Sequence, residues 1–123
     1  MNGSGLFNQD TLEAIFFEAE RLLGKSYGQN TFNCVHFVIT VFDKVGIPVP
    51  MMDENIQLPV THNNLGGVIL LDIRTKKPGD QRNFTHCGIV HTNGLIHCSR
   101  QFGRCVSITP WDKVWQKYEL AEL

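Results

Sequence analysis

Apolar positions recur with two different periods along the chain. Over residues 12–23 they return every three to four positions, which is the period of an α-helix with one buried face. Asp10 and Glu13 have the spacing of a capping box, and Gly24 favours a left-handed stop, so a first amphipathic helix is expected between Asp10 and Gly24. Its apolar positions are Leu12, Ile15, Phe16, Ala19, Leu22 and Leu23.

A second helix is predicted after the polar loop 25–32. Asn33 is a favourable N-cap, the residues behind it are apolar on most sides, and Gly46 with Pro48 ends the pattern. Because Val and Ile in this segment weaken helix propensity, a strand over the same residues stays open. Residues 48–66 carry three prolines and little periodicity, which predicts a long loop of the kind that often forms the wall of a binding site.

The second half of the chain changes to short apolar or alternating runs. Turn-rich segments separate them, and Thr92-Asn93-Gly94 has the composition of a hairpin turn. The closing segment 111–120 is expected to form a short helix or a final strand. Helices followed by an antiparallel meander predict one α+β domain over residues 1–123, with N-terminal helices packed on an antiparallel sheet of about five to six strands. The runs are 67–73, 86–90, 94–99 and 105–109.

Composition and charge narrow the class of protein. A hydrophobic content of 42% and a charged content of 19% are typical of a globular domain. The net charge of -1 argues against nucleic acid as the main partner, and the one adjacent basic pair, Lys76-Lys77, lies in a Pro/Gly-rich loop. No apolar run has the length of a membrane span, and the N-terminus lacks the features of a secretory signal, so synthesis in the cytoplasm is expected.

The four cysteines show no CxxC spacing, so they are predicted to be free thiols. Cys87, Cys98 and Cys105 are expected to be core residues of strands. Adjacent residues of a strand point to opposite faces, so Cys87 with His86, and Cys98 with its neighbouring histidine, are poorly placed to bind one metal ion. We therefore expect no metal site and no cofactor.

Cys34 is the candidate with a chemical rationale. If Asn33 caps the second helix, Cys34 lies in its first turn, where unpaired N–H groups and the helix dipole favour a thiolate. The same N–H groups can bind the oxyanion of an acyl-transfer intermediate. His86 begins a predicted strand and His97 lies across the hairpin from it, so one imidazole can face the thiol while the other orients it.

Each of these residues also has a structural reading. Cys34 can be a small core residue, His86 a surface histidine at a strand end, and His97 a buried histidine with satisfied hydrogen bonds. His62 and His91 are expected in loops.

Five short segments carry motifs in a definite order: GKSY at 24–27, NCVHFV at 33–38, GIPVP at 46–50, HCGIVHTNGLIHCS at 86–99 and GRCVSITPWDKVW at 103–115. In this order they resemble the NlpC-type cell-wall peptidases. That family shows G-x-x-Y, then D-C-S-G followed by an apolar residue, then G-h-x-h-P with h apolar, and later H-V-G-I-Y and I-H-A-S around a turn. The resemblance covers roughly residues 10–120, and no single motif decides it.

The resemblance implies a papain-like fold and a catalytic triad. It implies Cys34 as the nucleophile, His86 as the general base and His97 as the residue that orients His86. Tyr27 matches a tyrosine that lies beside the nucleophile in the family and can assist the oxyanion hole. The family mostly cleaves peptide bonds in peptidoglycan stems, so a peptide or muropeptide substrate is expected.

Departures from the family pattern fall in the segment expected to face the substrate. Asn33 replaces the usual Asp, Val35 the usual Ser and His36 the usual Gly, and the loop before the cysteine is several residues shorter. The family's Pro-Gly-Asp is reduced to Leu-Gly-Gly at 65–67. The triad is intact, so these changes concern specificity. Asn33 and His36, together with Tyr27, are the candidates for binding the substrate or the oxyanion.

A wall substrate lies outside the membrane, whereas no export signal is visible. A phage or prophage protein, associated with tail proteins or released at lysis, is the favoured expectation; delivery as an effector and a non-wall substrate are alternatives. The function is open in two further ways. The chain can be a non-catalytic virion, assembly or binding module of the same fold, or an amidase or acyltransferase that acts on a small amide.

Overall fold

The computed structural model describes residues 7–49, 65–75 and 85–121 of the chain. Most of the long loop expected at 48–66, including His62, and the Lys76-Lys77 pair lie outside these ranges. In chain order the elements are α1 (Gln9–Glu20), α2 (Cys34–Val45), β1 (Val68–Ile73), β2 (His86–His91), β3 (Gly94–Ser99), β4 (Cys105–Thr109), α3 (Trp111–Lys117) and β5 (Tyr118–Leu120).

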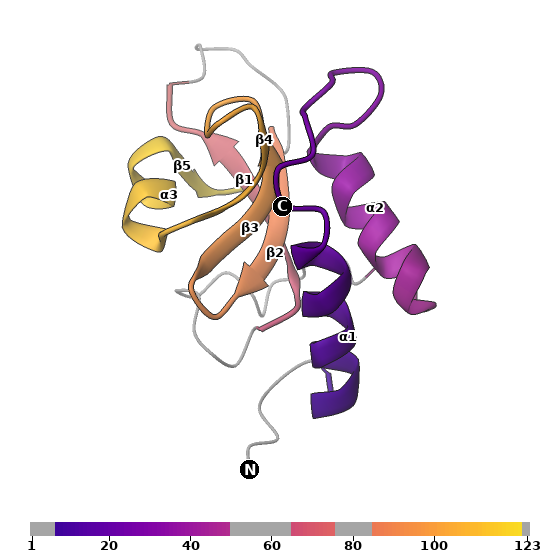
Figure 1. Cartoon of the computed structure of the whole chain (residues 1–123). Helices are drawn as coiled ribbons and strands as arrows, with labels where there is room; N and C mark the ends of the chain where they lie inside the picture. The colour runs from indigo at the N-terminus through magenta and orange to yellow at the C-terminus, as the bar shows by residue number, and fades with distance from the viewer. Residues whose placement is uncertain (1–6, 50–64, 76–84, 122–123) are drawn as a thin grey trace.

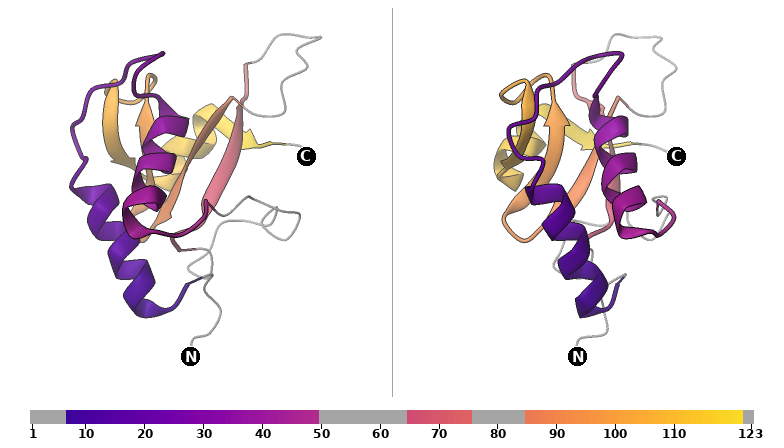
Figure 2. Two further views of the ribbon diagram at one scale, coloured as in Figure 1. Left: turned by 90° about the vertical axis from the view of Figure 1, so that its right-hand side faces the viewer. Right: turned by 45° about the vertical axis from the view of Figure 1, so that its right-hand side comes forward.

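The five strands form one antiparallel sheet in the order β4-β3-β2-β1-β5. A two-residue turn between His91 and Gly94 joins β2 to β3, as the hairpin pattern predicts. Helices α1 and α2 lie on one side of the sheet and α3 on the other (Figure 1), and both further views agree (Figure 2). The predicted α+β fold, with N-terminal helices on an antiparallel sheet, is confirmed.

Helix α2 forms because its local signals agree with its packing. The Asn33 side chain accepts hydrogen bonds from the N–H groups of Val35 and His36, and Gly46 closes the helix at φ +84°. The buried face of the helix packs against β2 and β3, and this burial outweighs the weak helix propensity of its β-branched residues. Its fully buried positions are Phe37, Val38, Val41 and Phe42.

Helix α1 begins earlier than the sequence pattern predicts. Asn8, not Asp10, is the N-cap, because its side-chain oxygen accepts the N–H of Thr11 at 2.8 Å. Asp10 lies in the first turn, where the positive end of the helix dipole stabilises its negative charge. The helix ends at Glu20, and turns continue to Gly24, which has φ +87° as expected of a left-handed stop.

Helix α1 is also fixed to the sheet by an unexpected contact. The loop assignment for His91 is wrong, because this residue is buried on β2 and its Nε2 lies 2.9 Å from a carboxylate oxygen of Glu20. The Phe16 ring packs on the same imidazole, with ring centroids 4.7 Å apart. His91 therefore has a structural role on the helix side of the sheet.

The C-terminal segment forms both of the elements that the sequence left open. Helix α3 ends at Lys117, and the chain then extends directly into β5. Strand β5 pairs antiparallel with β1, with Tyr118 opposite Ile73. This pairing brings the last aromatic residue of the chain to the end of the sheet where β2 begins.

Candidate active site

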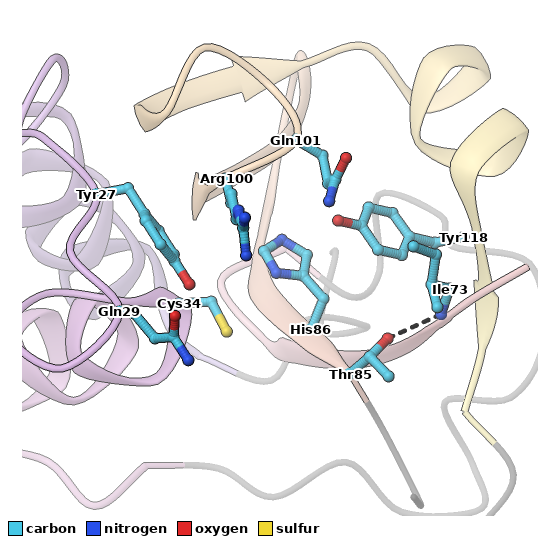
Figure 3. A pocket seen from close by; sticks show the side chains of 9 residues that line it. All are labelled: Tyr27, Gln29, Cys34, Ile73, Thr85, His86, Arg100, Gln101 and Tyr118. Atoms are coloured by element: carbon cyan, nitrogen blue, oxygen red, sulfur yellow. Dashed lines mark hydrogen bonds between the residues drawn. The ribbon is translucent and has the colours of Figure 1, made fainter. Parts of the chain in front are cut away.

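A cavity of about 410 Å³ lies where the N-terminus of α2 meets the start of β2 (Figure 3). The loop before α2, the end of β1, the turn after β3 and the start of β5 also contribute to its walls. The side chains that carry its chemistry are Tyr27, Cys34, His86, Arg100, Gln101 and Tyr118.

Local hydrogen bonds hold the walls of this cavity in place. The Thr85 hydroxyl accepts the N–H of Ile73 at 2.8 Å, which ties the end of β1 to the residue before His86 (Figure 3). After β3, the Ser99 hydroxyl accepts the N–H groups of Gln101 and of the residue that follows it. This turn places Arg100 and Gln101 on the wall of the cavity.

Cys34 is the first residue of α2, and its thiol points into the cavity toward the His86 ring (Figure 3). Asn33 occupies the next two N–H groups of the helix, those of Val35 and His36. Within the described ranges, the Cys34 N–H has no acceptor at hydrogen-bond distance. A backbone donor is thus available beside the sulfur, and the helix dipole adds a positive potential.

The surroundings of Cys34 favour its thiolate form and lower its pKa to about 4. The largest cause is a hydrogen bond from the Cys87 thiol; burial, the next largest, acts in the opposite direction, and a hydrogen bond from His86 with the positive charge of that ring lowers the pKa further. The pKa of Cys87 is raised, first because its proton is held in the bond to Cys34 and then by burial. The negative charge of the pair therefore resides on Cys34.

His86 and Cys87 approach the Cys34 sulfur from different sides, since neighbouring residues of a strand point to opposite faces. His86 uses its Nε2 in another contact, 2.6 Å from Nδ1 of His97. The Nδ1 of His86 is therefore the ring nitrogen that can bind the Cys34 thiol. Beyond His97, the Thr109 hydroxyl lies 2.8 Å from the Nε2 of that histidine.

His97 is fully buried, and burial lowers its pKa to about 2, with a further contribution from the charge of His86. The ring is therefore neutral at all working pH values. A neutral imidazole between His86 and Thr109 can orient the His86 ring by hydrogen bonding.

Two aromatic contacts fix the plane of the His86 ring. Tyr118 stacks on it with centroids 4.9 Å apart and an interplanar angle of 14°, and His97 meets it edge-on at 66°. Tyr118 is almost fully buried, and burial raises the pKa of its phenol. The stacked ring of Tyr118 therefore covers one face of the His86 imidazole and fixes its orientation.

The structure brings together the three residues predicted to form the triad, Cys34, His86 and His97. Tyr27 lines the cavity, and Figure 3 shows its hydroxyl beside the thiol. Asn33 and His36 instead cap α2: the His36 Nδ1 accepts the Asn33 N–H at 3.2 Å, and neither side chain lines the cavity. A part in substrate binding for Asn33 and His36 stays a prediction, since their visible role is to hold the helix start.

Sequence reasoning did not find five residues of this site. Cys87 is buried in the core, as predicted, but its contact with Cys34 was not expected, and its adjacency to His86 was the one available signal. Arg100, Gln101, Thr109 and Tyr118 were not singled out. Their positions depend on strand pairing and on the turn after β3, which carry no local motif.

In the described part of the chain, no cluster of three His, Cys, Asp or Glu side chains is arranged to bind a metal ion. No helix within the described ranges is long and apolar enough to cross a membrane.

Comparison with known proteins identifies a structural neighbour. A crystal structure from Staphylococcus aureus, described as similar to a lipoprotein of the NLP/P60 family, superposes with a TM-score of 0.53 and 19% sequence identity. The match covers 95% of this chain but 43% of that protein, so the chain spans less than half of its neighbour's length. No profile of a known protein family matches the sequence, and no curated protein is significantly similar to it. At this identity the likeness shows the fold alone, which agrees with the fold expected from the motifs.

Proposed function

We propose that the chain is a cysteine hydrolase that cleaves amide bonds in peptides, with the stem peptides of peptidoglycan as its substrate class. The observation that carries this proposal is the convergence of Cys34, His86 and His97 at a cavity large enough for a short peptide segment. The NLP/P60 neighbour supports it at the level of the fold. The low pKa of Cys34 supports it chemically, because the nucleophile is already charged near neutral pH.

The geometry suggests the following course of reaction. The Cys34 thiolate attacks the carbonyl carbon of the scissile amide, and the negative charge moves to the carbonyl oxygen. The Cys34 N–H and the Tyr27 hydroxyl are the donors available for that oxyanion. His86 gives its Nδ1 proton to the amine nitrogen as the C–N bond breaks, which leaves a thioester on Cys34. Water, deprotonated by His86, then hydrolyses the thioester and restores the free thiolate–imidazolium pair.

Hydrolysis of purified muropeptides tests the proposal. The products are identified by mass spectrometry for the wild type, Cys34→Ala and His86→Ala, with Cys105→Ala as the matched control, because Cys105 is a free cysteine outside the cavity. We expect cleavage by the wild type and the control only. If no muropeptide is cleaved while Cys34 still has a low-pH thiolate, the substrate is another amide. If Cys34 behaves as an ordinary thiol, the chain is better understood as a binding or assembly module.

A further inference from the structure

We propose that Thr109 is a positioning residue that holds His97 in the tautomer which accepts a hydrogen bond from His86. The inference rests on the proposed function, because it gives Thr109 a part in maintaining the Cys34–His86 pair. It extends the chain of hydrogen bonds by one side chain, from the thiol through two imidazoles to a buried hydroxyl.

The strand register explains why Thr109 reaches His97. Ser107 on β4 lies directly opposite His97 on β3, so Thr109 is the diagonal neighbour on the same face of the sheet. At the start of β3, Gly94 has φ +147°, and a Cβ there would collide with the Thr109 carbonyl. The two strands therefore approach closely where Thr109 is held, and Thr109 is 5% exposed.

Burial leaves His97 with two partners for its two nitrogens. Its Nδ1 is 2.6 Å from His86 and its Nε2 is 2.8 Å from Thr109, while its other close neighbour, the Phe102 ring, offers no lone pair. A neutral imidazole carries one proton, so one of its nitrogens donates and the other accepts. Whether Nδ1 or Nε2 of His97 carries the proton therefore depends on what each of the two partners can donate or accept.

In the reactive state of the site, the hydrogen bonds allow only one placement of the His97 proton. When Cys34 is a thiolate and His86 an imidazolium, both nitrogens of His86 carry protons. The Nε2–H of His86 then requires an acceptor, and His97 Nδ1 is in position to accept it. The single proton of His97 must therefore be on Nε2, where the Thr109 oxygen accepts it.

Removal of the Thr109 hydroxyl reverses the preference of the His97 proton for Nε2. The Nε2–H of His97 becomes a buried donor without an acceptor, which is unfavourable, so the proton moves to Nδ1. Two N–H groups then face each other across 2.6 Å, and the imidazolium form of His86 loses its acceptor. The Cys34 thiolate loses its counterion as a result, although Thr109 contacts neither the sulfur nor the cavity.

The test is the rate of iodoacetamide alkylation of Cys34 against pH, followed by peptide mass spectrometry. Thr109→Val has nearly the same shape and lacks the hydroxyl, whereas Thr109→Ser retains it. We expect Thr109→Val to lower the rate at pH 5–6 by roughly 10- to 100-fold, the range found when a metal-ligating histidine loses its outer hydrogen-bond partner. The midpoint of the profile should rise, and Thr109→Ser should resemble the wild type.

Ser107→Ala is the matched control. It removes a hydroxyl directly opposite His97, but that hydroxyl donates to the Phe102 carbonyl, so the profile should not change. The titratable groups that interact with Cys34, namely His86, Cys87, Cys98 and Tyr118, are the same in all variants. A Thr109→Val profile equal to that of the wild type, with both proteins folded by circular dichroism, overturns the proposal.

A second measurement needs no variant. In ¹⁵N-labelled wild-type protein, the histidine ring nitrogens report directly which of them is protonated. We expect His97 to carry its proton on Nε2 while Cys34 is a thiolate, and a proton on Nδ1 overturns the proposal even if Thr109→Val fails to fold. An ordinary thiol profile in the wild type would instead reject the thiolate–imidazolium pair, and with it the proposed function.

Discussion

Gly88→Ala tests whether the spacing between β2 and β3 holds the candidate triad. The register that pairs Ile89 with Ile96 places Gly88 opposite His97. A Cβ on Gly88 would lie 2.7 Å from the Leu95 Cδ1 and 3.0 Å from the His97 Cβ, both shorter than ordinary carbon contacts. Leu95 and His97 are fully buried, so neither can move into solvent.

The added methyl group should therefore cost about 1–3 kcal/mol of folding free energy, as overpacking of a core typically does. For a chain of this size, about 2 kcal/mol corresponds to a fall in Tm of roughly 5–10 °C. Because His97 must shift away from β2, its contact with His86 should lengthen, and the alkylation of Cys34 at pH 5–6 should slow.

Thermal unfolding by circular dichroism and the alkylation profile measure the two effects separately. Gly46→Ala is the control: its Cβ would meet no atom within 4 Å, but its φ of +84° is unfavourable for alanine. It should lower Tm by an amount that corresponds to about 1 kcal/mol and leave the alkylation profile unchanged. If Gly88→Ala has the Tm of the wild type and the same alkylation profile of Cys34, the packing argument is wrong.

Three further outcomes are expected. Alkylation of Cys34 should persist down to about pH 4 and fall at lower pH, because the thiolate exists above the lowered pKa. Cys87→Val removes a hydrogen-bond donor to the Cys34 sulfur and should move the midpoint of this pH profile upward, whereas Cys98→Ala should not. Tyr118→Phe should retain the reactivity of Cys34, whereas Tyr118→Leu should lower it several-fold, because the stacked ring and not its hydroxyl holds the plane of the His86 imidazole; equal profiles for the two variants would contradict this. Asn33→Ala should reduce stability by about 1 kcal/mol, measured by urea unfolding, because two first-turn N–H groups lose their acceptor.

The sequence determined the features that depend on neighbours along the chain. The Asn33 cap and the Gly46 stop are short-range signals, and both are present as predicted at the ends of α2. The hairpin turn after His91 is likewise local, since two turn residues fix the pairing of the strands beside them. These elements place Cys34 at a helix start and put His86 and His97 on paired strands, which is why the candidate triad could be predicted.

Local patterns were less informative where two signals competed. Asn8 and Asp10 are both suitable N-caps, and the sequence offered a capping box for Asp10, but the chain bends into the helix at Asn8. His91 has the polar neighbours of a loop residue, yet α1 packs over it and Glu20 binds its ring. In both cases the packing of α1 on the rest of the chain decided the outcome.

Only the tertiary structure decided which other side chains meet the triad. Tyr118 reaches His86 because β5 returns to pair with β1, a contact between segments more than 30 residues apart whose register no local motif encodes. Thr109 reaches His97 by the diagonal offset of β4 against β3, and Cys87 reaches Cys34 because α2 packs on that face of β2. A sequence specifies residue types and local conformation, but the hydrogen bonds of a buried site depend on distances between elements, which are set when the sheet and helices pack together.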